Sequence, residues 1–182
     1  MKKQVESDET RIRQMAAGDP DALVDMMNRY QDVALSLAYR NTQNWTDAED
    51  IVQESFLRIF KSAAHYQGQS SFKTWLYRIV VNLCIDHQRK KKTGVSLDTT
   101  AMDISAQAES DPLETQETAA IVQKAVHELP ERQRVALILH RYENLSHAQI
   151  SETTGWSRSS VESLLVRAYE NLRNKLEGLK ND

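Results

Sequence analysis

The segment from Phe72 to Lys92 carries the residue types that contact with a nucleic acid requires. One helical face mixes cationic, amide and aromatic groups, and the segment ends in consecutive cations: Lys73, Tyr77, Arg78 and Asn82 on the face, then Arg89, Lys90, Lys91 and Lys92. Cations hold phosphate groups, while amide and aromatic groups contact the edges and faces of bases. These residue types predict a surface that faces phosphate and bases.

An apolar stripe on the same segment predicts how that surface is positioned. Its members recur at helical spacing: Phe72, Trp75, Leu76, Ile79, Val80 and Leu83. We therefore expect an amphipathic helix that packs this stripe on protein. Trp75 fits two roles, because its spacing from Phe72 and Ile79 suits a core residue and its ring also suits base stacking.

A second candidate lies nearer the C-terminus. Residues 146–154 (SHAQISETT) predict a short helix capped by Ser146, and Gly155 follows where a left-handed residue ends a helix. Ser157 can cap the next helix, which presents polar residues outward: Arg158, Ser159, Ser160, Glu162, Ser163 and Arg167. This is the helix-turn-helix pattern of DNA-binding proteins. An antiparallel helix pair without a ligand has the same pattern, so both interpretations stay open.

Helices must position both candidates, and the sequence predicts an all-α protein. With only 5 Gly and 3 Pro among 182 residues, strand-and-turn architectures are disfavoured. Helix starts are marked by caps and prolines: Ser7, Asp19-Pro20, a capping box at 46–49, Pro130 and Ser146. The expected helices run from Ser7 to Gly18, from Pro20 to about Tyr39, from Thr46 past Phe60, over 72–92, from about Leu113 to Leu129, from Pro130 to Tyr142, and over 146–154 and 158–176. Residues 65–71 (HYQGQSS) predict a loop.

The net charge of −3 hides a basic surface, because the charge is unevenly distributed. Residues 1–92 hold 14 basic and 12 acidic side chains, a net of +2, whereas residues 93–126 hold one basic and six acidic, a net of −5. Charges separated by more than about 10 Å are largely screened at 0.1 M salt, so the local excess governs contact with DNA. The composition thus remains compatible with a nucleic-acid partner.

Other features of the sequence limit which cellular compartment and which kinds of chemistry we expect. No apolar run reaches bilayer length, and the N-terminus (MKKQVESDET) has no apolar signal core, so we expect a cytoplasmic protein without membrane insertion. The single cysteine, Cys84, excludes an internal disulfide and suits a small buried residue. The five histidines are scattered, and we expect neither a metal nor a cofactor.

Three segments, in their order and separation, resemble bacterial RNA polymerase sigma factors of the extracytoplasmic-function (ECF) group. They are 47–60 (DAEDIVQESFLRIF), 66–92 (YQGQSSFKTWLYRIVVNLCIDHQRKKK) and 129–176. The resemblance implies two helical domains: residues 1–92, which bind core polymerase and read the minus-ten promoter element, and residues 114–182, which read the minus-thirty-five element. Residues 93–113 would be an acidic, flexible linker between them.

The resemblance implies a polymerase-binding surface on the third helix. Its residues would be Asp47, Asp50, Ile51, Gln53, Glu54, Phe56 and Leu57. Acidic and amide groups beside apolar ones suit a partner rich in arginine. From the residues alone, a solvated face with ordinary helix-start acids stays open as the alternative.

The resemblance also implies which residues contact promoter DNA. Those for the minus-ten element, melted to expose the non-template strand, would be Tyr66, Gln67, Gln69, Ser70, Lys73, Arg78, Asn82, Arg89, Lys90, Lys91 and Lys92. Those for the minus-thirty-five duplex would be Ser157, Arg158, Ser159, Ser160, Glu162, Ser163 and Arg167. The chain departs from the family at Glu162 and Leu164, where the family often has cations, and at Thr154, which replaces a common leucine. Glu162 repels phosphate, so we expect weak intrinsic binding by this domain.

The family's usual regulator, an anti-sigma protein that wedges between the domains, is implied as a further partner. The acidic linker has two interpretations, a solvated tether or a segment that enters the RNA exit path of polymerase. A sigma factor is not an enzyme, and no nucleophile–base pair, phosphate loop or metal set appears in the sequence. The alternatives are a stand-alone helix-turn-helix regulator and a helical adaptor protein.

Overall fold

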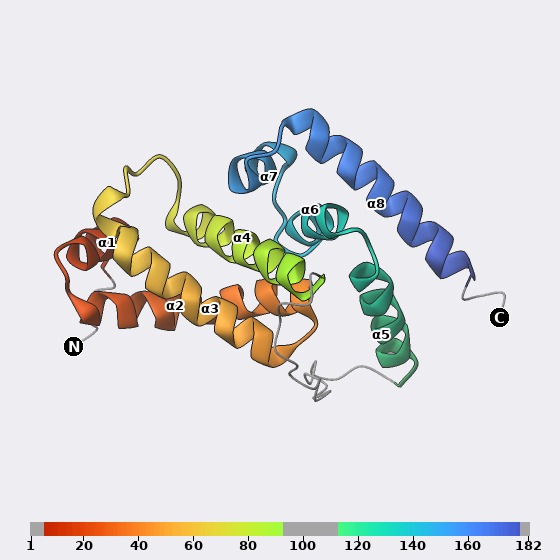
Figure 1. Ribbon diagram of the computed structural model, residues 1–182, viewed down its shortest axis with the longest axis horizontal. Coiled ribbons are helices and arrows are strands. Elements are labelled where there is room, and N and C mark those ends of the chain that lie inside the picture. Colours follow the sequence, from red (N-terminus) through yellow and green to blue (C-terminus); the bar gives the residue numbers. More distant parts are fainter. Residues whose placement is uncertain (1–5, 93–112, 179–182) are drawn as a thin grey trace.

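The computed structural model describes residues 6–92 and 113–178, and helices make up its regular structure there (Figure 1). The helices are α1 (Asp8–Ala16), α2 (Pro20–Thr42), α3 (Trp45–Ser62), the short 3₁₀ helix η1 (Ala63–His65), α4 (Phe72–Lys92), α5 (Leu113–His127), α6 (Glu131–Arg141), α7 (His147–Thr154) and α8 (Arg158–Gly178). The all-α prediction is confirmed. The predicted linker, residues 93–113, lies outside the described residues except for Leu113.

Capping residues mark the starts of most helices at the positions that the sequence predicted. Ser7 caps α1 by accepting a hydrogen bond from the Thr10 N–H, and Asp19 caps α2 with Pro20 at the first helical position. Ser146 and Gln149 form a reciprocal capping box at α7, and Gly155 ends that helix with a φ of +74°. These predicted starts are confirmed. They could be predicted because each cap involves only residues that lie a few positions apart.

The predicted start of α3 is wrong by two residues. Asn44, rather than Thr46, is the N-cap, and its side-chain oxygen accepts a hydrogen bond of 2.9 Å from the Asp47 N–H. Gln43 ends α2 in the left-handed conformation with a φ of +53°, which turns the chain sharply enough for the next helix to begin at Trp45. Thr46 therefore lies inside the first turn of α3.

Helices α1–α4 pack as one bundle, which we call the first unit. Helix α2 packs against α3 and α4, and α1 covers one end of the bundle beside η1 (Figure 1). The α4 stripe is buried as predicted at Phe72, Leu76 and Val80, and Cys84 is buried with it. The prediction for Tyr77 is wrong. We expected this residue on the polar face of the helix, but its side chain is buried and only 1% exposed.

Helices α5–α8 form the second unit, in which α8 packs on α5, α6 and α7. Val161, Leu165 and Ala168 bury the inner face of α8, as the helical spacing predicted. The second unit lies directly against the first, since α4 packs on α7 and α2 packs on α6 (Figure 1). Buried apolar residues from both units consequently form one connected cluster.

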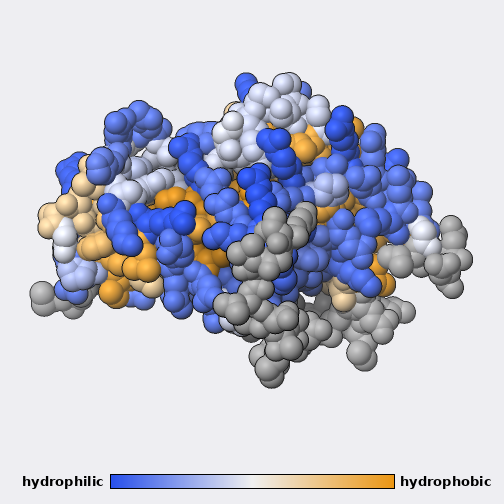
Figure 2. All heavy atoms as spheres, viewed as in Figure 1, coloured by the Kyte–Doolittle hydropathy of each residue, from blue (hydrophilic) through white to orange (hydrophobic). Residues whose placement is uncertain are grey.

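The surface of the molecule is mostly hydrophilic on the face shown in Figure 2. Apolar residues gather on that face at the end of the first unit that holds α1 and η1. Within the described ranges, no helix combines the length and the apolar character that crossing a bilayer requires.

Candidate nucleic-acid interface

The loop before α4 forms a hollow with a volume of about 260 Å³. It is lined by loop residues and by the start of α4: Ser62, His65, Tyr66, Gln67, Gln69, Ser70, Trp75 and Arg78. The rings of Tyr66 and Trp75 stack with their centroids 4.7 Å apart, and the Tyr66 hydroxyl donates to the Ser70 carbonyl. Gly68 makes the turn with a φ of +69°, a conformation that glycine adopts without strain. The structure therefore brings four predicted loop residues to one aromatic hollow.

Trp75 combines the two roles that its sequence position left open. Its ring packs edge-on against Phe72 at 6.0 Å between centroids, as a core residue does. The same ring is half-buried, stacks on Tyr66 and lines the hollow. An aromatic side chain fixed in this way presents a rigid surface on which a base can stack.

The polar side of α4 divides between solvent and the second unit. Lys73 and Asn82 are exposed, and the Lys73 ammonium lies 5.2 Å from the centroid of the Tyr77 ring. Arg78 donates from Nη2 to the Glu152 carbonyl of α7 at 2.7 Å. The Tyr77 hydroxyl donates to the Glu143 carboxylate, and burial together with this carboxylate raises the pKa of Tyr77. The face predicted for DNA is thus partly covered by the chain itself.

The cations at the end of α4 do not point to a single surface. Arg89 lies 3.8 Å from Glu131 of the second unit, whereas Lys91 lies 3.8 Å from Asp47 of α3. Lys90 is exposed, and the side chain of Lys92 lies outside the described residues. The sequence showed the cations as one run, but helical geometry distributes them around the helix.

The predicted polymerase-binding residues of α3 separate into an outer and an inner set. Asp50, Gln53 and Leu57 are exposed, Leu57 by 48%. Glu54 is half-exposed and accepts a hydrogen bond of 2.7 Å from Arg58, which lowers the pKa of Glu54.

Three of the predicted α3 residues have little or no surface to offer a partner. Ile51 and Phe56 were predicted to form part of the contact surface, but the structure buries both side chains in the core. Asp47 is also buried and lies 3.0 Å from His87 and 3.8 Å from Lys91 of α4. These residues hold α3 against α4 and thereby fix the position of the outer set.

The N-terminal end of α8 is open to solvent. Ser157 caps the helix by accepting from the Ser160 N–H at 3.2 Å. Ser160 is half-buried, and the other predicted residues are exposed: Ser157, Arg158, Ser159, Glu162, Ser163 and Arg167. Glu162 lies 3.7 Å from His147 of α7. Exposed arginines and hydroxyls at a helix N-terminus can bind phosphate.

Arg132 belongs to the same surface, although the sequence gave no sign of it. A hollow of about 270 Å³ is lined by Arg132 together with residues of α8: Ser159, Ser160, Ser163, Leu164 and Arg167. The Arg132 guanidinium lies 4.5 Å from the centroid of the Trp156 ring in the helix-helix turn. Because Arg132 lies in the first turn of α6 and far from α8 in sequence, only the packing of α6 on α8 brings it there.

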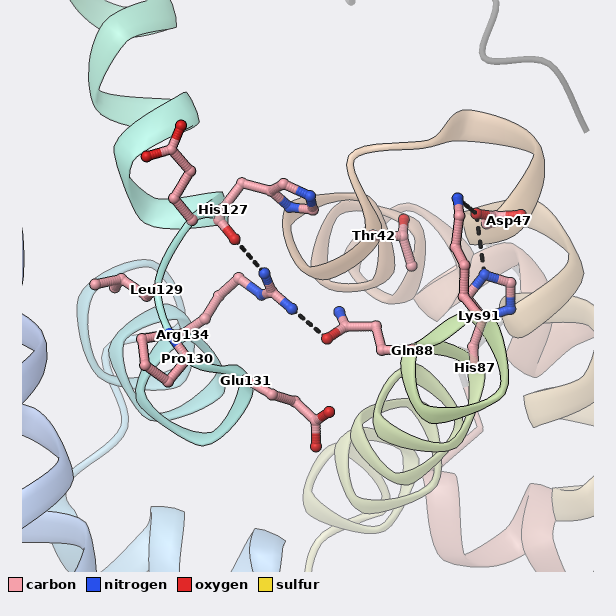
Figure 3. Close-up of a pocket in the computed structure, with 11 residues that line it drawn as sticks. Thr42, Asp47, His87, Gln88, Lys91, His127, Leu129, Pro130, Glu131 and Arg134 are labelled. Carbon is pink, nitrogen blue, oxygen red and sulfur yellow. Dashed lines mark hydrogen bonds and ion pairs between the residues drawn. The ribbon is translucent and has the colours of Figure 1, made fainter. Parts of the chain in front are cut away.

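Between the two units lies a further cavity of about 500 Å³, shown in Figure 3. Its central group is the buried Arg134, which donates to the His127 carbonyl and to the Gln88 side chain across the cavity (Figure 3). Burial, and then the nearby Arg134, lowers the pKa of His127. Gln88 in turn donates to the Asn41 carbonyl at 2.8 Å. The cavity is therefore framed by polar contacts that cross from one unit to the other.

The chain matches two known family models. Residues 26–93 match Sigma-70 region 2, and residues 119–172 match Sigma-70 region 4. The ECF RNA polymerase sigma factor SigW of Bacillus subtilis is 33% identical over 180 residues, which cover 93% of this chain and 96% of that protein. The ECF RNA polymerase sigma-E factor of Haemophilus influenzae is 29% identical over 184 residues, covering 95% of this chain and 97% of its own length.

Two solved structures share the fold. CnrH, solved in complex with the cytosolic domain of CnrY, has a TM-score of 0.68 at 22% identity and covers 95% of this chain and 99% of its own. The sigma factor RpoE of Bartonella quintana, solved with the anti-sigma factor NepR, has a TM-score of 0.67 at 22% identity and covers 84% and 94%.

Proposed function

Because this chain belongs to the ECF group of RNA polymerase sigma factors and is a promoter-specific initiation factor, we propose that it binds core polymerase and reads two promoter elements with separate domains. The domains are residues 1–92 and 114–182. One observation carries this proposal: the aromatic hollow before α4 and the exposed N-terminal end of α8 lie within the matched regions 2 and 4 of one chain.

The polymerase-binding surface is the outer set on α3. Asp50 and Gln53 supply an acidic and an amide group, Leu57 supplies exposed apolar surface, and Glu54 adds a second carboxylate. A mixed surface of this kind suits a partner with basic and apolar groups. Ile51 and Phe56 pack in the core and hold α3 in position.

The hollow before α4 is proposed to receive a base of the melted minus-ten element. Trp75 and Tyr66 provide stacking surface, while the side-chain amides of Gln67 and Gln69 provide donors and acceptors for a base edge. Capture of an exposed base offsets an unpairing cost of a few kcal/mol. Lys73, Asn82 and the cations at the end of α4 are proposed to hold the backbone of the strand.

The N-terminal end of α8 is proposed to enter the major groove of the minus-thirty-five element. Ser159, Ser160 and Ser163 are small enough for close approach to base edges, and Arg158 and Arg167 are proposed phosphate contacts. Arg132 adds a third cation, which partly offsets the repulsion between Glu162 and phosphate. Each domain is expected to bind weakly by itself and to gain affinity when polymerase holds both.

We also propose an anti-sigma protein as a partner. The second unit has an apolar groove of about 500 Å³ between α5, α6 and α8, lined by Val122, Val126, Leu137, Arg141, Tyr142, Tyr169 and Leu172. An amphipathic helix of a partner could fill such a groove. Two proteins of the same fold were solved with bound partners, one of them named as an anti-sigma factor. The proposed setting is the cytoplasm, where polymerase carries out all nucleotidyl chemistry.

In vitro transcription with core polymerase tests the proposal. Core polymerase and the purified chain, incubated with a library of promoter fragments, should yield transcripts from a subset that shares two sequence elements. The chain should also co-migrate with core polymerase on a sizing column, and Leu57→Ala should weaken that association. Tight, specific DNA binding by the chain without polymerase would instead favour a stand-alone regulator.

A further inference from the structure

Glu162 is an acidic side chain on the helix that is proposed to enter the major groove of DNA. It lies one turn beyond Arg158, the residue at which α8 begins. Its side chain is 64% exposed, so the carboxylate is open to a ligand. Because DNA is negatively charged, a carboxylate in this place opposes binding to every sequence unless some sequences offer it a favourable contact.

The helical spacing of α8 places Glu162 between the proposed phosphate contacts. At about 3.6 residues per turn, one outer face of the helix holds four exposed residues: Ser159, Glu162, Ser163 and Val166. Arg158 and Arg167 lie on opposite edges of that face. If the two arginines hold phosphates, the face between them meets the edges of bases. Glu162 is therefore placed for contact with a base.

His147 of α7 lies beside Glu162 without occupying its carboxylate. The distance from the His147 Nδ1 atom to the nearer carboxylate oxygen is 3.7 Å, which is too long for a hydrogen bond. Both side chains are also well exposed, by 40% for His147 and 64% for Glu162, and exposed ion pairs contribute little. This contact leaves Glu162 able to accept hydrogen bonds from a ligand.

The bases differ in what their major-groove edges offer to a carboxylate. An ionised carboxylate only accepts hydrogen bonds. Cytosine presents its N4 amino group as a donor, whereas guanine presents the N7 and O6 acceptors and thymine presents the O4 acceptor. Adenine has an amino donor at N6, but its N7 acceptor lies beside that group and repels a carboxylate. Cytosine is consequently the base that suits Glu162 best.

We propose that Glu162 is a specificity-determining residue, which accepts a hydrogen bond from the N4 amino group of a cytosine in the minus-thirty-five element and rejects guanine and thymine at that position. This inference rests on the proposed function, because the duplex must lie against α8 as proposed there. The repulsion between Glu162 and phosphate remains, and it makes binding depend more strongly on the matching base. A good contact to a base edge discriminates against a wrong base by about tenfold.

The base preference is tested with core polymerase, the full chain and a promoter library that is randomised through the minus-thirty-five element. Sequencing of the transcribed fragments should show cytosine enriched about tenfold at one position for the parent chain. Glu162→Gln should move the preference at that position alone toward adenine, because a glutamine amide can bond to both N6 and N7 of adenine. Glu162→Ala should show no preference there. A parent chain without a cytosine preference, or variants that keep the parent's preference, would overturn the proposal.

Glu170→Gln is the matched control, because it removes the same charge from an exposed position about two turns further along α8. Its base preferences should equal those of the parent chain. Thermal unfolding should be the same for all four proteins, since both glutamates are exposed. If Glu162→Gln raises binding at every sequence and changes no preferred base, Glu162 acts by repulsion alone and the assignment is wrong.

A selection without polymerase separates this inference from the proposed function. The full chain selects double-stranded DNA with a randomised segment at low salt, where contacts to phosphate are strengthened. A cytosine preference that Glu162→Gln changes, combined with no transcription by core polymerase, would refute the proposed function and retain the role of Glu162. Transcription from a subset of promoters with no effect of Glu162 on base preference would have the opposite meaning.

Discussion

The N-terminal end of α8 and the Tyr77 side of α4 are both candidate DNA surfaces, yet they differ in what covers them. The residues of α8 are exposed or half-buried, with Arg158 and Arg167 directed to solvent. On α4, Tyr77 is buried against Glu143 and Arg78 is engaged by the Glu152 carbonyl. The second unit therefore leaves the end of α8 open and covers Tyr77 of α4, while Lys73 and Asn82 of α4 stay exposed.

The largest effect is expected from Leu76→Ala, which tests whether the two surfaces share one cooperative core. Leu76 is fully buried on α4, so its truncation should lower the free energy of unfolding by about 2–5 kcal/mol. Because the apolar residues of both units form one cluster, hydrogen exchange should show the second unit opening together with the first. Leu57→Ala, on the exposed side of α3, should change stability by less than about 0.5 kcal/mol. A second unit with unchanged protection would show that the units fold independently.

Arg167→Ala should have the next largest effect, and it changes only the exposed surface at the N-terminal end of α8. Loss of one phosphate contact should weaken binding of the minus-thirty-five duplex about tenfold at every sequence, and the slope of log affinity against log salt should fall by about one. Ser160→Ala or Ser163→Ala should change the preferred bases instead. Footprinting of the polymerase complex measures both outcomes, and a footprint unaffected by Arg167→Ala would remove this residue from the surface.

Arg132→Ala should weaken the same duplex binding by a smaller factor, about threefold, because Arg132 is exposed and lines the hollow from another helix. Arg132→Lys keeps the charge but not the planar group over Trp156, so it should restore only part of the affinity. Association of the chain with core polymerase, followed on a sizing column, should be the same for all three proteins. Full affinity in Arg132→Ala would confine the reading surface to α8.

The smallest effect concerns pH and the cavity between the units. Burial and the neighbouring Arg134 lower the pKa of His127, with a further contribution from Lys91, whereas Glu128 acts in the opposite direction. The protonated form is thus favoured in the unfolded chain, so stability should be lost as pH falls below about 6.5 toward the folded-state pKa. Thermal melts between neutral and mildly acidic pH should show a shallower decline for His127→Gln. An identical decline in both proteins would assign the pH dependence to other groups.

Much of the fold could be predicted because its signals are local. Ser7, Asp19-Pro20 and the Ser146–Gly155 segment act on backbone groups within a few residues, and their helices begin and end as expected. The start of α3 was missed by two residues, since Asn44 satisfies the same Asp47 N–H that a Thr46 cap leaves unpaired. The α4 and α8 core stripes were predicted from periodicity alone.

Residue types and spacing determined that this chain is helical and where most of its helices begin, and they predicted a loop-and-helix surface for bases followed by a helix-turn-helix. Tertiary structure alone decided that Tyr77 is buried, that Arg132 joins the α8 surface and that Arg134 spans the cavity between the units. The physical reason is the distance along the chain over which each kind of interaction acts. Caps and periodicity act over one or two helical turns, whereas the Tyr77 hydroxyl meets its acceptor 66 residues away, where only the packing of one unit on the other can place it.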